Sequence, residues 1–279
     1  MRKLLKDNLR GIVVVVAPER RKRPHEGRDE GFVCPFCPGN EAMTPPEIMR
    51  VPERGAWKVR VFPNKYPIVE GHEVIVDSPD HDADLDTMDE EHLNLLMGVW
   101  RRRLEAHSSR PYVILFRNYG LGAGASISHP HTQLVPLDVV PEIPGRESER
   151  LREGACLLCG DYAHVVATAG GYAVGVPHVQ TLPYETWIFP LSHERTFSGD
   201  PPFGRILSRL IGALKGEFGV REYNLVLHQA PRGYDYHWHL EVMPRLGKFA
   251  GFELGTGMRV LHYSREEFVE RLRRALQLP

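Results

Sequence analysis

Apolar residues recur along the chain with two different periods, and together they predict an α+β protein. Residues 93–104 and 206–214 each carry apolar side chains at i, i+3, i+4 and i+7, as expected for a helix that lies with one face on a sheet. β-Branched and aromatic runs broken by Pro and Gly, beginning with "GIVVVVAP" near the N-terminus, predict strands. A final helix is expected from Ser264, because Glu267 completes a capping box before an apolar stripe.

The chain repeats itself at a shift of about 110–120 residues, which indicates tandem structural units. Four landmarks keep their order in both copies: a Cys-x-x-Cys pair, an extended segment that ends in His, a second extended segment, and a His-x-His pair. Each copy should therefore contain a Cys-x-x-Cys loop, strands, a helix and two further strands, the last ending in the histidine pair. We expect two similar halves, residues 1–145 and 146–279, packed around antiparallel sheet.

Composition and charge narrow the classes of function. The chain has 279 residues, of which 42% are hydrophobic and 25% charged, enough to bury a large core in one or two domains. A formal net charge of -1 creates no general attraction for nucleic acid or a membrane. The N-terminal sequence lacks a signal-peptide pattern, and "GIVVVVAP" is too short to span a bilayer. We expect a cytoplasmic protein that binds small ligands, and neither nucleic acid nor a membrane.

All four cysteines fall in two Cys-x-x-Cys pairs, a spacing that suits metal thiolates better than cytosolic disulfides. Zinc prefers four tetrahedral Cys and His ligands. The first predicted ligand set is Cys34, Cys37, His81 and His129, and the second is Cys156, Cys159, His193 and His237. A single pair could equally be buried thiols or a redox motif, but matching histidines in both copies favour metal. Because protein ligands fill all four positions, we expect two structural zinc ions.

The stretch "SISHPHTQ" places His129 and His131 on either side of a proline. On an extended backbone, residues two apart share a face. If zinc holds His129, the ring of His131 is fixed beside a rigid anchor while remaining available to another partner. The alternative is a buried, hydrogen-bonded His131 without a chemical role, and Gln133 on the same face argues against it.

Several separated motifs, in order, resemble one known family over nearly the whole chain. "PERRKRPHEG", "CPFCPGNE", "VFPNKYP", "SPDH" and "ASISHPHTQ" are similar to the phosphate-binding segment, zinc loop, nucleoside loop, third zinc ligand and active-site signature of galactose-1-phosphate uridylyltransferase and its histidine-triad superfamily relatives. The resemblance implies two histidine-triad-like halves. It also implies a ping-pong reaction of galactose metabolism, in which UMP passes from UDP-glucose to galactose 1-phosphate through a uridylyl-histidine.

The resemblance assigns roles to individual residues. His131 matches the nucleophile, and Gln133 matches a glutamine that hydrogen-bonds a non-bridging phosphate oxygen. The positions that match substrate contacts are Arg20, Arg23, Asn64, Asn118, Ser126, Lys248 and Phe249. Family members are typically homodimers with shared sites, so Lys248 and Phe249 are expected near a hexose of the partner. Taken alone, the arginines would be a solvated basic run and Phe249 a core residue.

The second half departs from the best-known bacterial form of the family, whose metal site there contains a glutamate and three histidines. The candidates for such a site in this chain are Glu147, His228, His239 and Glu241, and this set would admit iron. Some relatives, including ADP-glucose phosphorylases, instead resemble the double-zinc arrangement. Adenylyl transfer from ADP-glucose to phosphate is therefore a close alternative, and hydrolysis through His131 is another. A zinc-stabilised nucleic-acid-binding protein is the alternative from a different class, against which the near-zero net charge argues.

Overall fold

The computed structural model describes residues 3–7, 9, 12–26 and 30–276, and a ten-stranded antiparallel sheet dominates it. The strands of this sheet are β3 (Met49–Val51), β4 (Val59–Pro63), β5 (Glu73–Val76), β6 (Tyr112–Tyr119), β7 (His131–Leu137), β8 (Ala163–Ala169), β9 (Tyr172–Pro177), β10 (Thr186–Pro190), β11 (Tyr223–His228) and β12 (His239–Pro244). Their spatial order is β3-β4-β5-β7-β6-β11-β12-β10-β9-β8. From one edge of the sheet inward the strands are β3-β4-β5-β7-β6, and from the other edge inward they are β8-β9-β10-β12-β11. In both parts the fifth strand in chain order lies between the third and the fourth, and the two parts meet at the β6–β11 pair.

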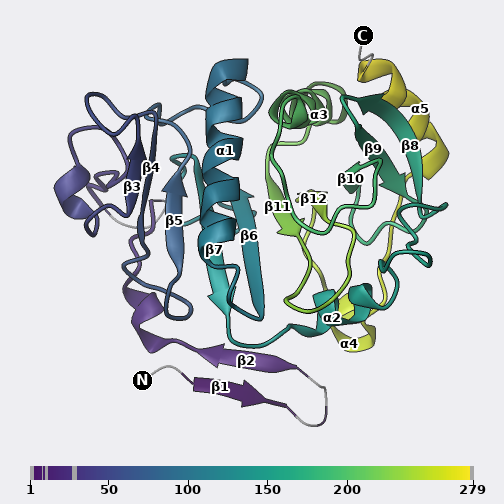
Figure 1. Cartoon of the computed structure of the whole chain (residues 1–279), viewed down its shortest axis with the longest axis horizontal. Helices are drawn as coiled ribbons and strands as arrows, with labels where there is room; N and C mark the ends of the chain where they lie inside the picture. The colour runs from purple at the N-terminus through teal and green to yellow at the C-terminus, as the bar shows by residue number, and fades with distance from the viewer. Residues whose placement is uncertain (1–2, 8, 10–11, 27–29, 277–279) are drawn as a thin grey trace.

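Three helices, α1 (Glu90–Ala106), α3 (Phe203–Phe218) and α5 (Arg265–Ala275), share one apolar core with the sheet (Figure 1). The other helices of the described chain are α2 (Glu142–Ser148) and α4 (Gly251–Thr256), with 3-10 turns at Pro18–Lys22 and Glu41–Met43. The predicted stripes form the buried faces, and Trp100 of α1 and Leu210 of α3 are fully buried. The predicted cap of α5 is present, because the Ser264 hydroxyl accepts a hydrogen bond from the Glu267 N–H at 3.2 Å.

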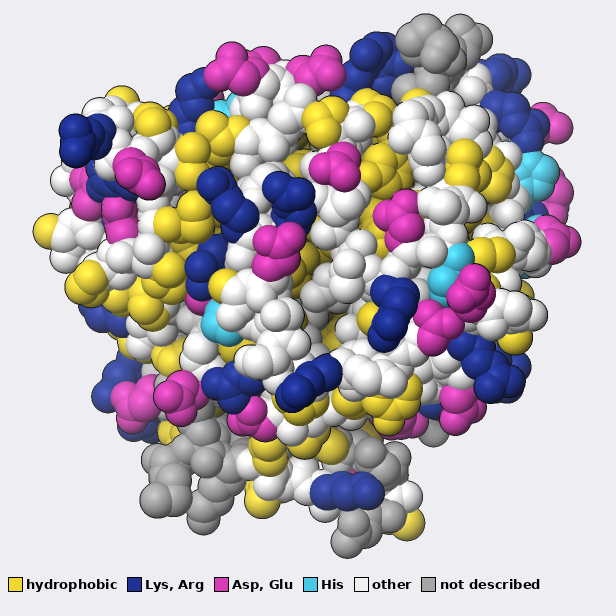
Figure 2. Space-filling view, in the orientation of Figure 1, with side chains coloured by type: hydrophobic (Ala, Val, Ile, Leu, Met, Phe, Trp, Pro, Cys, Tyr) yellow, Lys and Arg dark blue, Asp and Glu magenta, His cyan; other side chains and the backbone are white. Residues whose placement is uncertain are grey.

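The expectation of a mixed α and β protein with a large antiparallel sheet is confirmed. The core is continuous across the β6–β11 pair, since side chains of α1, α3 and α5 belong to one cluster. The expected division between residues 145 and 146 lies inside α2. None of the helices in the described part of the chain is long and apolar enough to cross a membrane. Figure 2 shows basic and acidic side chains interspersed over one face of the molecule.

Within "GIVVVVAP", Val13–Val16 forms a strand, and that strand lies outside the large sheet. β2 (Val13–Val16) pairs with β1 (Lys3–Lys6) in a separate two-stranded hairpin, which lies beyond the ends of β5 and β7 (Figure 1). The preceding segment supplies a local antiparallel partner, and the Asp7 N–H donates to the Ile12 carbonyl at 2.8 Å beside the turn. This local pairing provides hydrogen-bond partners for the backbone N–H and C=O groups of β2, so β2 does not need to join the central sheet.

The histidine pairs stand at the start of the last strand of each part, and the prediction that they end these strands is wrong. His131 and His239 are the first residues of β7 and β12. In the first pair the intervening Pro130 has no N–H to donate to the ladder, so regular pairing starts after it. Successive residues of β7 point to opposite faces, and Leu134 lies in the helix-covered core. His131 and Gln133 therefore face the other side of the sheet.

Candidate active site and metal centres

His131 presents a neutral imidazole with a defined tautomer. Its Nδ1 lies 2.9 Å from the His129 carbonyl oxygen, and because a carbonyl only accepts, Nδ1 carries the proton. The Nε2 lone pair is therefore available. Burial lowers the pKa of His131 to about 4, and although the hydrogen bond to His129 opposes this, the charges of Arg117 and Arg23 add to it. At neutral pH His131 can act as a nucleophile without first losing a proton.

A cavity of about 280 Å³ lies beside His131. Its wall combines apolar rings, such as Phe36 and Phe62, with a few polar groups, as small-molecule sites usually do. The ring of Phe36 meets that of His131 edge-on, with centroids 5.2 Å apart. Five of the predicted site residues line this cavity: Arg23, Asn64, Ser126, His131 and Gln133.

The other predicted substrate contacts lie elsewhere. Arg20 is adjacent to the cavity, because its Nη1 donates to the carbonyl of the lining residue Tyr66 at 2.7 Å. Asn118 of β6 accepts a hydrogen bond from Asn224 at 2.8 Å and is not among the lining residues. Lys248 and Phe249 line a separate cavity of about 200 Å³, so the described chain does not bring them to His131.

Two residues near the site were not singled out from the sequence. Glu26 accepts hydrogen bonds from the Ser128 backbone N–H at 2.5 Å and from its hydroxyl at 2.7 Å. His72 is buried, and its Nε2 lies 3.1 Å from Oε1 of Gln133. Both connect segments that are far apart in sequence. The local residue pattern around them carried no signal of these contacts, although Glu26 lies within the motif "PERRKRPHEG".

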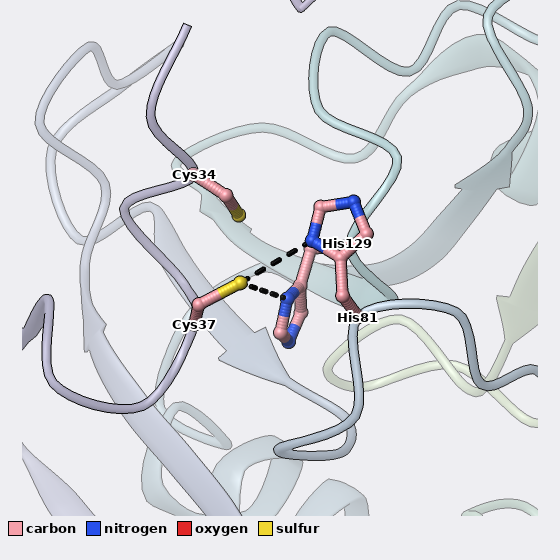
Figure 3. A group of neighbouring side chains, drawn as sticks. All are labelled: Cys34, Cys37, His81 and His129. Carbon is pink, nitrogen blue, oxygen red and sulfur yellow. Dashed lines mark hydrogen bonds between the residues drawn. The ribbon is translucent and has the colours of Figure 1, made fainter.

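The first predicted metal set is assembled from three parts of the chain (Figure 3). The ligand atoms of Cys34, Cys37, His81 and His129 all lie within 4.8 Å of one another. Sγ of Cys37 is 3.3 Å from Nδ1 of His81 and 3.6 Å from Nδ1 of His129. His129 Nε2 lies 2.8 Å from the Ser78 carbonyl oxygen, so Nε2 carries the proton and the Nδ1 lone pair faces the thiols.

The ionisation of these groups agrees with a metal site. Burial raises the pKa of Cys34 to about 12, so a thiolate there requires a neighbouring cation. Burial lowers the pKa of His129 to about 4 and keeps it in the neutral form that binds metals. Four ligands of this kind fit a tetrahedral metal ion and leave no position open for a substrate.

The second predicted set repeats this arrangement. Sγ of Cys156 lies 3.3 Å from Nδ1 of His237, and Sγ of Cys159 lies 3.5 Å from Nδ1 of His193. His237 Nε2 is 2.9 Å from the Pro190 carbonyl oxygen, so its Nδ1 lone pair also faces the thiols. As in the first set, the four ligand atoms all lie within 4.8 Å of one another.

Three of the four residues of the alternative second-half metal set are also brought together, without Glu241. Ligand atoms of Glu147, His228 and His239 lie within 4.8 Å of one another. His228 is 3.7 Å from Glu147 through Nδ1 and 3.7 Å from Glu241 through Nε2. The two second-half sets coexist, because His237 belongs to the thiol set and His239 to the carboxylate set.

His239 has the place in β12 that His131 has in β7, but different surroundings. Its Nδ1 lies 3.2 Å from the His237 carbonyl oxygen, as in the first histidine pair. Its ring stacks on Trp187 with centroids 4.3 Å apart and planes 5° apart, and on His228 at 5.1 Å. Aromatic rings therefore cover this histidine where the first half has a cavity.

Comparisons with known proteins give consistent matches. The N-terminal domain of a domain of unknown function (DUF4931) matches residues 17–140. ADP-glucose phosphorylase from Arabidopsis thaliana is 29% identical, over 91% of this chain and 87% of that protein. Galactose-1-phosphate uridylyltransferase from Thermotoga maritima is 25% identical, over 93% of this chain and 94% of that protein.

Solved structures agree with these relatives. The crystal structure of the Arabidopsis thaliana ADP-glucose phosphorylase with bound ADP-glucose has a TM-score of 0.79 and 28% identity, and covers 98% of this chain and 99% of that chain. A uridylyltransferase structure has a TM-score of 0.82 and 29% identity, and covers 99% of each chain. The resemblance inferred from the motifs is therefore confirmed. The chain is similar, in sequence and in fold, to the galactose-1-phosphate uridylyltransferases and to ADP-glucose phosphorylase.

Proposed function

We propose that the protein is an enzyme that transfers a nucleoside monophosphate from a nucleoside diphosphate sugar to a second phosphate acceptor through His131. The observation that carries this proposal is the tautomer of His131. Its Nδ1 proton is held by the His129 carbonyl, and the ring lines a cavity large enough for part of a nucleotide. A neutral imidazole whose unprotonated nitrogen can face a bound substrate is a competent nucleophile toward phosphorus.

The proposed reaction has two balanced steps. Nε2 of His131 attacks the α-phosphorus and forms a P–N bond, while the bond from that phosphorus to the oxygen bridging the β-phosphate breaks. The sugar 1-phosphate leaves with that electron pair. An oxygen of the acceptor phosphate then attacks the nucleotidyl-histidine, and His131 departs with the lone pair of Nε2 restored.

Other residues of the cavity suit the charges of this reaction. Arg23, and Arg20 beside Tyr66, supply guanidinium groups for the phosphates. Gln133 lies on the same face as His131 and would donate to a non-bridging oxygen. Ser126 and Asn64 are further polar contacts, and the apolar rings of the cavity wall, such as Phe36 and Phe62, suit a nucleobase. We retain Asn118 as a more distant contact expected from the resemblance.

We propose structural zinc at both Cys/His sets. The donor types and the directed Nδ1 lone pairs support this assignment, and a bound ion would supply rigidity to the backbone that carries His131. Glu147, His228 and His239 offer the harder donors that would admit iron in the second half.

Two substrate pairs are candidates. The motifs favour UMP transfer between UDP-glucose and galactose 1-phosphate. The alternative, phosphorolysis of ADP-glucose, is supported by the 29% identity to the Arabidopsis thaliana ADP-glucose phosphorylase and by the complete second Cys/His set. Both reactions pass through the same adduct on His131.

The same strand order in the two parts supports two histidine-triad-like halves, 1–145 and 146–279. A homodimer, in which Lys248 and Phe249 reach the partner's site, remains a proposal from the resemblance. So do the cytoplasmic location and the absence of nucleic-acid binding. Sedimentation of the metal-replete protein would test the dimer.

The decisive experiment is mass spectrometry of the intact protein and its peptides after incubation with UDP-glucose or with ADP-glucose, acceptor omitted and acid avoided. A UMP adduct on His131 would support the uridylyltransferase, and an AMP adduct would support the ADP-glucose enzyme. The His131→Ala variant is the control and should carry neither adduct. If neither nucleotide labels the metal-replete wild type, the proposal of a covalent transfer is wrong.

A further inference from the structure

We infer that His72 is a positioning residue that orients the side-chain amide of Gln133 toward the phosphate, an inference that rests on the proposed function. His72 immediately precedes β5, and only 1% of its surface is exposed. Its two ring nitrogens contact different parts of the chain. Nδ1 lies 2.9 Å from the Ile68 backbone nitrogen, and Nε2 lies 3.1 Å from Oε1 of Gln133.

The first of these contacts determines the tautomer of His72. A backbone N–H can only donate, so Nδ1 accepts from Ile68 and has no proton. The proton of the neutral ring is therefore on Nε2, which donates to Gln133. Only the amide oxygen of Gln133 can accept this hydrogen bond, so the NH₂ group is turned away from His72. Gln133 lines the cavity, and its NH₂ group is thereby available to an acceptor bound there.

The side-chain amide of Asn64 also lies next to the Nε2 proton of His72. Oδ1 of Asn64 accepts from the Tyr66 backbone N–H at 2.8 Å, so its NH₂ group lies toward His72, with Nδ2 3.2 Å from Nε2. Two donors face each other there, and no hydrogen bond can form between them. The hydrogens of Asn64 are left for an acceptor in the cavity, which Asn64 also lines. A bound group rich in acceptor oxygens, such as a phosphate, satisfies both amides.

Without His72 the amide of Gln133 loses the hydrogen bond that fixes the positions of its oxygen and its NH₂ group. In the flipped orientation, Oε1 would face the non-bridging oxygens of the phosphate and repel them. Loss of one well-placed donor to a developing oxyanion slows a reaction by about 10²–10³-fold. We therefore expect the replacement of His72 by Phe, a ring without a donor, to slow adduct formation on His131 by at least about tenfold and by no more than Gln133→Ala does.

The test is a double-mutant cycle on the rate of adduct formation, with whichever of UDP-glucose and ADP-glucose labels the wild type. If His72 acts through Gln133, His72→Phe in the Gln133→Ala background should cause little further loss. His72→Gln, whose amide can both accept from Ile68 and donate to Gln133, should recover most of the rate. The matched control is His107→Phe, because His107 contacts the neighbouring Glu73 at 2.7 Å and should leave the rate unchanged. Equal losses from His72→Phe with and without Gln133 would overturn the inference.

Nitrogen-15 spectra of the labelled wild type test the geometry without turnover. We expect a neutral His72 with its proton on Nε2, and a proton on Nδ1 would contradict the inference whatever the adduct experiment gives. Absence of any adduct on the wild type would instead count against the proposed function. The two failures are therefore distinguishable, and the spectra also serve if the Phe variant does not fold.

Discussion

At the scale of single residues, one backbone hydrogen bond decides which role each histidine of the first pair can take. His129 gives its Nε2 proton to the Ser78 carbonyl and directs Nδ1 to the thiols. His131 gives its Nδ1 proton to the His129 carbonyl and keeps Nε2 for the cavity. The two rings are chemically identical and only two residues apart, but the unprotonated nitrogen is Nδ1 in His129 and Nε2 in His131. One ring is therefore suited to a metal and the other to a substrate.

This division predicts different losses from two substitutions. His131→Ala should retain the zinc content and thermal stability of the wild type and form no nucleotide adduct. His129→Ala should lose zinc from the first set and unfold at lower temperature, because a ligand and a buried contact disappear together. Elemental analysis and calorimetry on the two variants check this, and equal zinc loss in both would mean that the roles are assigned wrongly.

The residues that sequence could predict are those whose signal is local. Cys-x-x-Cys spacing and its repetition indicated both metal sets, and the motif around His131 indicated the cavity wall. His72 and Glu26 were missed because their partners, Gln133 and Ser128, lie 61 and 102 residues away in the chain. A buried histidine in a short segment before a strand has the same local pattern whether or not it contacts an active site.

At the scale of elements, the C-terminal end of α1 is attached to the first residue of β5 by ionic hydrogen bonds to the buried carboxylate of Glu73. Glu73 accepts hydrogen bonds from Arg103 at 2.6 and 2.8 Å and from His107 at 2.7 Å. Burial opposes the ionisation of Glu73, but the hydrogen bonds from His107 and Arg103 outweigh it and hold its pKa below the usual value of 4.5. The ionised carboxylate thus stabilises the packing of α1 on the sheet.

The sign of this shift predicts an acid-dependent loss of stability. A carboxyl group with a lowered pKa stabilises the folded state above pH 4.5, and its contribution disappears as the pH falls through the folded-state pKa. Glu73→Gln should therefore be less stable than the wild type at pH 7, and the difference should shrink below pH 4.5. Urea unfolding at a series of pH values measures it, and a difference that stays constant with pH would exclude this role.

The elements themselves were largely predictable, because helix stripes and the capping box at Ser264 are short-range features. The placement of β2 was not, since "GIVVVV" has the composition of a buried central strand. Its partner was decided by the neighbouring β1, and periodicity says nothing about which strand pairs with which. The histidine pairs were assigned to the wrong ends of their strands for a similar reason, since the pattern marks a strand more clearly than its boundary.

At the scale of the whole molecule, buried charges join the two parts of the sheet. Arg117 of β6 donates to Asp77 at 2.9 Å, to Asp84 at 2.7 Å and to the hydroxyl of Tyr223 on β11 at 2.6 Å. Lys215 of α3 lies 2.5 Å from Asp84 as well. Arg117, Asp77 and Asp84 are at most 1% exposed, so these groups depend on one another for compensation of their charge.

Removing the central cation should therefore destabilise the entire fold. We expect Arg117→Met to lower the free energy of unfolding by about 3–5 kcal/mol, because two carboxylates remain buried without it. Arg101→Met is the matched control: Arg101 is 44% exposed and pairs only loosely with Glu105, so its loss should cost no more than about 0.5 kcal/mol. Urea unfolding of metal-loaded protein gives both values, and a small loss from Arg117→Met would show that the network is dispensable.

The hydrogen bonds of Glu26 connect the first metal set with the substrate cavity. His81 donates from Nε2 to the Ser128 hydroxyl at 2.9 Å, this hydroxyl donates to Glu26, and the Glu26 N–H donates to the carbonyl of Ser126 at 2.9 Å. Ser126 belongs to the cavity wall and His81 to the metal set. A sugar nucleotide that strengthened this chain of hydrogen bonds would also strengthen the binding of a metal at the first set, and by reciprocity the metal would raise the affinity for the nucleotide to the same extent. An ion that never touches the substrate would in this way act as a sensor of its binding.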